Sequence, residues 1–276
     1  MSFKPRLLSE TAEIAFTEIK RFVEPQLMDA FSLRRVSAPL YLPVESELLD
    51  PRHPGARINL PGERGELEIV GSLDVWLRGQ LARYDIAPGF GVFAIMNAIR
   101  PNIQANAVSS PYVSSWAWQQ VIDVQQANRK HLSNVARKVF ALLVDAEKKI
   151  LELFPHLNAT LPKNLEIMGE DELIAKYPNY GPERRIYEYL HPESSQRSDA
   201  DAANNKHCAA LFVCRGGYIT HMEGEIWVWN RIINRPLCIA DLTLWGKDLV
   251  AERSVGGNIY RDCLALQVLH QNKLLV

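Results

Sequence analysis

The chain has 276 residues, of which 47% are hydrophobic and 23% are charged, a balance that is typical of ordinary globular proteins. This composition excludes an intrinsically disordered chain, a collagen-like chain and a small disulfide-rich scaffold. Lys and Arg together number 31 and Asp and Glu together number 32, so the formal net charge of -1 gives no overall field that would attract a polyanion. We therefore expect neither a nucleic-acid partner nor a membrane partner.

The cysteine pattern and the first residues both favour a cytoplasmic protein. The cysteines show neither the spacing of a zinc or redox motif nor a disulfide framework, so we expect buried thiols. They are Cys208, Cys214, Cys238 and Cys263. The first residues carry Lys4, Arg6 and Glu10 and lack the apolar core of a secretory signal. No stretch of the chain reaches the ~18–20 apolar residues of a membrane span.

The first part of the chain shows one helical pattern followed by strand patterns. Hydrophobic spacing predicts a helix over about residues 9–27. Alternating apolar residues predict a half-buried strand over 35–43, which Pro43 would end. Residues 51–64 are rich in Pro and Gly and are expected to form a loop or a wide hairpin tip. Apolar residues from Leu67 then begin another strand.

The middle of the chain alternates between strand and helix signals. Residues 73–81 have helical spacing, and the apolar run 92–96 predicts a strand that places Arg100 at its exit. Trp116 and Trp118 are interpreted as the opening of a long helix, because an apolar stripe at helical spacing continues from there to residue 154.

The last part of the chain is polar at first and apolar afterwards. Residues 191–206 contain no large apolar side chain, so we expect a mobile surface loop there. Residues 209–214 and 225–230 are strand-like, with a turn expected at Gly216-Gly217. Strands thus fall in two blocks separated by the long helix. This distribution predicts an α+β fold in which residues 1–276 form a single domain, with helices on one face of an antiparallel sheet.

Several segments, found in the right order along the chain, resemble the aspartate-ammonia ligases, which are ammonia-dependent asparagine synthetases. They are LEIVGSLDVWLRGQLARYDIAPGFGVFAIMNAIRP at 67–101, SPYVSSWAWQQVI at 110–122, DELIAKYPNYGPERR at 171–185, GEIWVWN at 224–230 and GGNIYRDCLALQVL at 256–269. The resemblance implies the fold of the class II aminoacyl-tRNA synthetase catalytic domain, an antiparallel β-sheet flanked by helices. It also implies a homodimer.

The resemblance further implies a reaction and its cofactors. Members of this family use ATP and Mg²⁺ to adenylate the side-chain carboxylate of aspartate, and ammonia then displaces AMP. This chemistry requires cations that hold phosphates, carboxylates that hold Mg²⁺ and hydrogen-bonding groups that hold the amino acid. Because several positions that would serve these needs are replaced in this chain, its own cofactors stay open.

Four residues stand where the resemblance places site residues. Arg100 in AIRP matches an arginine that binds α-phosphate and carboxylate oxygens, so it is our catalytic candidate as well as a nucleotide-binding one. Ser72 matches a serine of the amino-acid pocket, and Asp50 falls where an aspartate lies near the substrate amine. Glu225 in GEIWVWN matches an acidic site residue and is assigned to the nucleotide.

Other positions differ from what the resemblance implies. Leu77 replaces a substrate-binding lysine, and Ser115 replaces a glutamine that would contact the substrate. Cys238 replaces a glutamate expected to bind magnesium, and a thiol is a poor ligand for this hard cation. Asp241 replaces a substrate-site serine and Trp245 replaces an arginine. Ser115 and Asp241 are nevertheless kept as substrate-binding candidates.

The γ-phosphate arginine of the family aligns with Cys263. Arg261 lies two residues earlier and is the remaining candidate for that charge, so it joins Arg100 and Glu225 in the nucleotide group. No metal ligand is assigned.

Each candidate also has a structural alternative. Ser72 is suited to capping the helix that follows it, and Asp50 is suited to an Asx turn. The structural alternative for Arg100 is a salt bridge at the end of its strand. For Glu225 it is an ordinary surface position, and for Asp241 it is a helix N-cap.

Three functions follow as hypotheses. The first is a divergent relative that binds a small amino-acid-like or carboxylate ligand in a remodelled synthetase pocket, with ordinary ATP-dependent asparagine synthesis lost. The second is a catalytically inactive homodimer with a regulatory or interaction role. The third is an ATP-dependent amide-forming ligase that acts on a changed substrate in a specialised biosynthetic pathway, with Arg261 or Arg253 at the γ-phosphate and Glu223 or Glu225 at magnesium.

Overall fold

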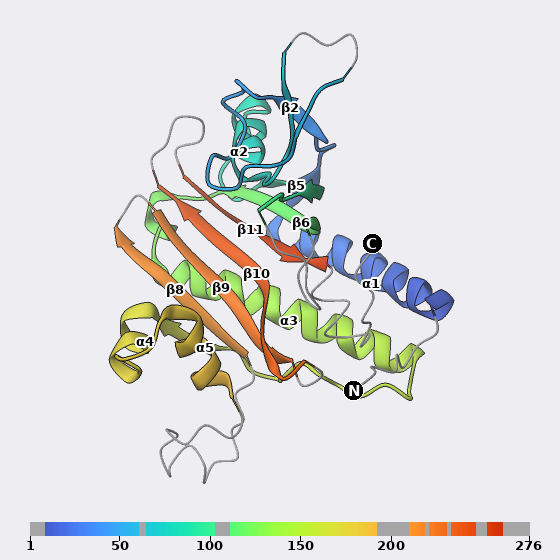
Figure 1. The fold of residues 1–276 in the computed structure, drawn as a ribbon, viewed down its shortest axis with the longest axis vertical. Coiled ribbons are helices and arrows are strands. Elements are labelled where there is room, and N and C mark those ends of the chain that lie inside the picture. Colours follow the sequence, from blue (N-terminus) through green and yellow to red (C-terminus); the bar gives the residue numbers. More distant parts are fainter. Residues whose placement is uncertain are drawn as a thin grey trace.

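The computed structural model describes residues 9–60, 65–102, 111–191, 210–218, 221–230, 233–246 and 253–261. Within these ranges the chain forms an eight-stranded sheet, a smaller three-stranded sheet and flanking helices (Figure 1). The predicted α+β class is therefore confirmed. The segment expected to be a mobile loop, 191–206, lies outside the described residues except for His191.

The large sheet has the strand order β1-β5-β6-β11-β10-β9-β8-β7. Its strands are β1 Leu33–Arg35, β5 Gly91–Ile99, β6 Tyr112–Val121, β7 Glu166–Gly169, β8 Ala210–Tyr218, β9 His221–Asn230, β10 Arg235–Trp245 and β11 Ser254–Tyr260. Neighbouring strands from β5 to β8 are antiparallel, whereas the edge pairs β1–β5 and β7–β8 are parallel. The central strands of the sheet are thus all antiparallel to their neighbours, and their side chains point to both faces of the sheet.

The small sheet and the helices surround this large sheet. The small sheet has the order β2-β4-β3, with strands β2 Tyr41–Pro43, β3 Arg57–Ile58 and β4 Leu67–Ile69. The helices are α1 Ser9–Phe31, α2 Asp74–Arg83, α3 Arg129–Leu153, α4 Glu170–Lys176 and α5 Pro182–Leu190, with a 3-10 turn η1 at Val124–Gln126. The expected helix over 73–81 and the strand beginning at Leu67 are both confirmed.

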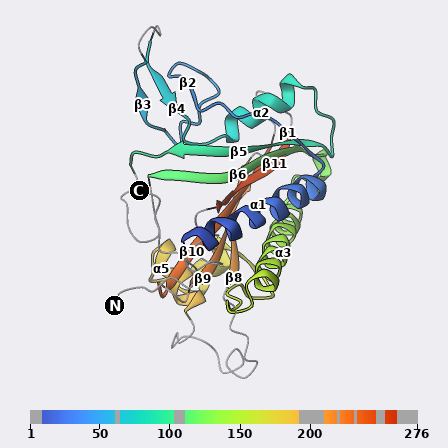
Figure 2. The ribbon, with the colours of Figure 1, turned by 90° about the vertical axis from the view of Figure 1, so that its right-hand side faces the viewer.

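Helices cover both faces of the large sheet, so the prediction that they lie on one face was wrong. On one face α1 and α3 lie side by side (Figure 2). On the other face α2 packs on β5 and β6, while α4 and α5 pack on β8 and β9. The apolar stripe of α3 accounts for one layer only, because Leu77 of α2 and Leu73, which directly precedes this helix, belong to a second, separate core.

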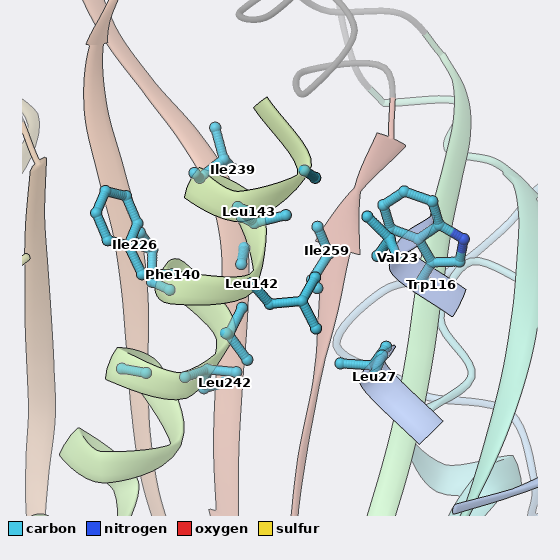
Figure 3. Close-up of a cluster of buried hydrophobic side chains, with 14 of the residues drawn as sticks. Val23, Leu27, Trp116, Phe140, Leu142, Leu143, Ile226, Ile239, Leu242 and Ile259 are labelled. Atoms are coloured by element: carbon cyan, nitrogen blue, oxygen red, sulfur yellow. The ribbon is translucent and has the colours of Figure 1, made fainter. Parts of the chain in front are cut away.

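The larger core shows why the strands have this register. Figure 3 shows Phe140 and Leu143 of α3 against Ile226, Leu242 and Ile259 of the sheet. Successive strand side chains point to opposite faces, so the even-numbered residues of β9 and of the part of β10 after residue 239 face this core. Each fully buried aliphatic side chain of this size contributes about 1.5–3 kcal/mol of transfer free energy. Burial of these side chains also fixes the odd-numbered residues of the same strand segments on the opposite face of the sheet.

Two predictions about secondary structure were wrong. Trp116 and Trp118 do not open a helix; they lie in β6, where both indoles point into the α1–α3 core while Ser115 points to the other face. The single strand expected over 35–43 is divided into the end of β1 and β2, which belong to different sheets.

Other differences are smaller. The first helix continues past residue 27 to Phe31 with Pro25 inside it. The expected loop over 51–64 contains β3, although 61–64 are not described. Gly216 lies within the bounds of β8, at an irregularity in its pairing with β9, and has a φ of 89°. Among the cysteines that the structure describes, Cys214 is buried and Cys238 is half-buried. Within the described ranges, no helix is long and apolar enough to cross a membrane.

Candidate functional site

One face of the large sheet is covered by α2 and by the α4–α5 pair, and the centre of this face, between them, is polar. Asp241 of β10 is paired with Asn258 of β11, and Tyr260 of β11 is paired with Ser115 of β6. Because their strand neighbours Ala240, Leu242 and Ile259 point into the α1–α3 core, these polar side chains point to the opposite face. We call this surface the polar face and define it by Ser115, Gln119, Asp241, Asn258 and Tyr260.

A buried amide joins two carboxylates on this face. The side-chain nitrogen of Asn258 donates to Oδ1 of Asp241 at 2.9 Å and to Oδ1 of Asp74 at 3.2 Å. The hydroxyl of Tyr260 donates to the other oxygen of Asp241. Asn258 and Asp74 are each only 3% exposed, whereas Asp241 is half-buried. The strand pairing of β10 with β11 and the first turn of α2 together create this arrangement.

The environment of Asp74 disfavours its charged form. Burial and the nearby negative charges of Asp241 and Asp50 raise the pKa of Asp74 to about 6, against the hydrogen bond from Asn258 and the charge of Arg52. Burial also raises the pKa of Tyr260 well above its ordinary value, with the charge of Asp241 acting in the same direction. Tyr260 is thus a neutral hydrogen-bond donor to Asp241.

Asp50 lies in a loop whose polar groups converge on its carboxylate. Its Oδ1 accepts the backbone N–H of Arg52 and the Nε–H of the same residue, both at 3.0 Å, and its Oδ2 accepts an N–H of the Arg52 guanidinium at 2.9 Å. Nδ1 of His53 lies 3.2 Å from Oδ2. Burial alone would raise the pKa of Asp50, but hydrogen bonds from His53 and Arg52 hold it well below its ordinary range. The expected Asx turn is therefore present.

Trp245 at the end of β10 gathers positive charge around its ring. The guanidinium carbon of Arg78 lies 3.8 Å from the ring centroid and that of Arg52 lies 4.6 Å from it. The ring of His221 lies 4.4 Å from the same indole, centroid to centroid. Arg52 is also 3.7 Å from Asp74, so it links this aromatic cluster to the carboxylates.

Glu225 and Arg215 form an ion pair at the α4 side of the polar face. Glu225 is the strand partner of Asp241 and so lies on the same face. Its Oε2 is 3.0 Å from an Arg215 guanidinium nitrogen and accepts the indole N–H of Trp227 at 3.1 Å. Arg215 also contacts Glu170 of α4 at 3.2 Å.

Arg100 and Ser72 lie at the junction of β5 and α2. Arg100 directly follows β5, as expected, and its Nε–H donates to the carbonyl of Gly71 at 3.0 Å. The hydroxyl oxygen of Ser72 accepts the backbone N–H of Asp74 at 3.2 Å, so it supports the start of α2. Arg100 is close enough to Tyr260 for its charge to lower the pKa of that phenol, against the larger opposing effects.

Two fully buried side chains of β6 lack hydrogen-bond partners among the described residues. These are the hydroxyl of Ser115 and both ends of the Gln119 amide. A Cβ atom on Gly256 would lie 2.7 Å from Cδ of Gln119, so glycine at 256 leaves the space that this amide fills. Buried polar groups normally have partners, which makes these positions candidates for contact with a bound molecule or water.

Arg261 is the candidate that the structure does not bring to the polar face. Its guanidinium carbon lies 5.6 Å from the ring centroid of Phe16 in α1 and 5.8 Å from that of Trp116. Both rings belong to the α1 side of the sheet. The other candidates lie on or beside the polar face: Asp50, Ser72, Arg100, Ser115, Glu225 and Asp241.

Comparison with known proteins decides the family. The model of the aspartate-ammonia ligase family matches residues 10–195. The chain belongs to the aspartate-ammonia ligase family. The aspartate–ammonia ligase of Bacteroides thetaiotaomicron is 31% identical over a match that spans 99% of this chain and 79% of that protein. The ligase of Fusobacterium nucleatum is 36% identical, but that match spans 63% of this chain and only 54% of the other.

Solved structures place this member of the aspartate-ammonia ligase family among class II synthetase folds. Asparaginyl-tRNA synthetase from Pyrococcus horikoshii, solved with asparaginyl-adenylate, aligns with a TM-score of 0.62 over 95% of this chain and 67% of that one, at 9% identity. The Entamoeba histolytica asparaginyl-tRNA synthetase aligns with a TM-score of 0.61, over 95% and 65% respectively. At this identity the likeness shows the fold, and the expected class II synthetase-like fold is confirmed.

The residues that the structure describes contain no preformed cluster of ligands for the Mg²⁺ that the resemblance to aspartate-ammonia ligases implies. No group of three or more His, Cys, Asp or Glu side chains among them could hold a metal ion. The side-chain nitrogen of Asn258 donates to both Asp74 and Asp241, so a cation bound between these two carboxylates would have to displace that donor. Cys238 directs its thiol to the carbonyl of Ala240 at 3.5 Å. The metal therefore enters no step below.

Sequence reasoning missed several residues of this site in the aspartate-ammonia ligase fold. Asp74 was noticed only within a helical pattern, and Asn258 and Tyr260 only within a glycine-containing run. The alternation of Asn258 and Tyr260 with apolar Ile259 is a signal that could have placed both on one face of a strand. Arg52 gave no signal, because its role depends on loop conformation.

Proposed function

We propose that this protein binds a small amino-acid-like or carboxylate ligand on the polar face and has lost ordinary ATP-dependent asparagine synthesis. Membership of the aspartate-ammonia ligase family supports an amino-acid-like ligand, because the family is named for an amino-acid substrate, aspartate. Arg100 would bind the ligand's carboxylate with its guanidinium, and Asp241 would bind hydrogen-bond donors of the same ligand.

The observation that carries the proposal is the chemistry at the positions that the family resemblance assigns to lysine, glutamate and arginine. Leu77 is fully buried among Leu73, Trp76 and other apolar side chains, so it supplies no cation. Cys238 supplies a thiol in place of a carboxylate, and Trp245 supplies an indole on which Arg78 is stacked. Arg261, the candidate for the γ-phosphate, lies toward α1. The polar face thus retains groups suited to an amino acid rather than to a magnesium nucleotide.

The test is ligand-induced thermal stabilisation of the purified protein. We expect the melting temperature to rise with small amino acids or carboxylic acids in the absence of ATP, since a ligand at 100 times its Kd adds about 2.7 kcal/mol to the free energy of unfolding. Arg100→Ala should abolish this rise. Arg137→Ala, which removes an exposed arginine of α3 that contacts Asn134, is the matched control and should leave it unchanged.

Two results would contradict the proposal. One is stabilisation by Mg-ATP that Arg100→Ala removes, since that result indicates a nucleotide site. The other is the absence of any shift with amino acids, carboxylic acids and Mg-ATP, which favours an interaction protein whose site has lost its ligand.

A further inference from the structure

A second cavity lies on the small sheet, which is remote from α5 (Figure 2). Its volume is about 390 Å³, and its walls come from the segment 44–54, from β3 and from β4. We propose that this cavity binds a small organic cation, an amine with an apolar body. The site is separate from the polar face of the large sheet and goes beyond the ligand proposed for that face.

The central strand of the small sheet directs a carboxylate into this cavity. Glu68 of β4 pairs with Leu42 of β2 and with Arg57 of β3, so these three side chains lie on one face of the sheet. Leu67 and Ile69, the neighbours of Glu68 along β4, point to the other face. The segment 44–54 lies against the Glu68 face, and the cavity is the space between them.

Glu68 is a buried carboxylate without a positive partner. It is 8% exposed, and its Oε1 accepts the backbone N–H of Gly55 at 2.8 Å. This N–H is the only hydrogen-bond partner of the carboxylate in the part of the chain that the structure describes, and no Lys, Arg or His there forms an ion pair with it. Buried charges are normally paired, because removing a carboxylate from water is costly. A bound cation would supply the missing charge.

The other charged groups at the cavity leave it negative. Glu47 also lines the cavity, is exposed and has no ion pair among the described residues. Arg57 is the cation among the described lining residues, but its guanidinium lies 3.1 Å from Glu66 and pairs with that carboxylate. The negative charges of Glu47 and Glu68 would therefore attract a cation and repel an anion.

The size and the walls of the cavity favour an organic cation over a metal ion. Apolar side chains line much of it, from Val44, Leu49, Pro51 and Pro54. Sites for small molecules are mostly apolar cavities of roughly 300–1,000 Å³ with a few polar groups, and this cavity falls in the lower part of that range. A metal ion would need several oxygen ligands, and no such cluster is present among the described residues.

Close backbone packing fixes the end of the segment that covers the cavity. A Cβ atom on Gly55 would lie 1.6 Å from the carbonyl oxygen of Ile69, and one on Gly71 would lie 2.0 Å from that of His53. The carboxylate of Asp50, another lining residue, is already bound by hydrogen bonds within its own loop. The cavity is thus preformed, and Asp50 contributes to its wall rather than to cation binding.

The experiment compares benzylamine, benzyl alcohol and benzoate by NMR titration of the full chain, followed through the backbone amides. Benzylamine should bind saturably and at least about tenfold more tightly than the neutral alcohol, as for a charge-assisted hydrogen bond. The Gly55 amide, which donates to Glu68, should be among those that shift, and benzoate should not shift it. Glu68→Gln keeps the size and an acceptor, and should reduce the amine preference to about twofold or less. Glu45→Gln, an exposed acid of the same segment, should keep it.

The outcomes separate this site from the polar face. Benzylamine binding should survive Arg100→Ala, and its loss in that variant would place the amine on the polar face and overturn the inference. Equal affinity for the amine and the alcohol would also overturn it, as would the absence of saturable binding or the same amide shifts with Mg²⁺ alone. If Glu68→Gln does not fold, Val44→Phe narrows the cavity without removing a charge and should abolish binding. Unchanged affinity in Val44→Phe would contradict the proposal.

Discussion

The guanidinium carbon of Arg78 lies 3.8 Å from the ring centroid of Trp245. This stacking joins α2 to the end of β10 across the polar face. An arginine that is stacked in this way still carries its charge, but its position is fixed by packing on an aromatic ring. The contact therefore joins residues that are 167 positions apart in the chain.

The Arg78–Trp245 contact should be measurable as a coupling energy. In a double-mutant cycle with Arg78→Met and Trp245→Leu, we expect the two residues to stabilise the fold together by about 0.5–2 kcal/mol, measured by urea unfolding. The matched control is the exposed pair Arg83 and Tyr84, in which the guanidinium carbon lies 5.9 Å from the ring centroid. We expect a smaller coupling energy for this pair. Equal coupling in the two cycles would show that the stacking adds nothing.

The raised pKa of Asp74 predicts a pH dependence of stability. The folded protein holds this proton up to about pH 6, whereas an unfolded aspartate loses it near 3.8, so the folded state binds more protons between these values. Stability from this group is therefore highest below pH 4 and falls as the pH rises to 6, by up to about 1.4 kcal/mol per unit. Urea unfolding from pH 4 to 7 should show a flatter profile for Asp74→Asn; parallel profiles would contradict the assignment.

The side chain of Gln119 should lower the stability of the ligand-free protein. Gln119→Met removes two buried polar atoms that have no hydrogen-bond partner among the described residues, so the free energy of unfolding of the ligand-free protein should rise by about 1 kcal/mol. Gln120→Met is the matched control, because that amide donates to the carbonyls of Phe31 and Gly89 and its loss should destabilise the protein. Chemical denaturation of both variants decides this, and destabilisation by Gln119→Met would contradict it.

Arg261 should affect stability and not ligand binding. Arg261→Ala removes a buried guanidinium from beside Phe16 and Trp116, so we expect a loss of about 1–2 kcal/mol in the free energy of unfolding. Titration with the ligand of the wild-type protein should give an unchanged Kd. A loss of affinity of tenfold or more would place Arg261 in the site after all.

The sequence was sufficient for the fold class, and most of the site candidates that it supplied lie on or beside the polar face. It was insufficient where residues act through distant partners. Asp74 is 184 residues from Asn258, and their contact depends on how α2 lies over β11. Trp116 and Trp118 were assigned to a helix because their apolar spacing merges with that of α3, and only the pairing of β6 with β5 and β11 distinguishes a strand. Arg261 was chosen for its charge and for its position two residues before Cys263. In the structure it directly follows Tyr260, the last residue of β11, and its guanidinium lies on the α1 side of the sheet.

The most direct measurement is calorimetric titration with Mg-ATP, followed by an assay of AMP release in the presence of aspartate and ammonia. We predict no saturable heat with Mg-ATP and no AMP, while a small amino acid binds to the same preparation without nucleotide. Stoichiometric binding of Mg-ATP, with AMP released only when aspartate and ammonia are both present, would show that the protein is an ordinary aspartate-ammonia ligase.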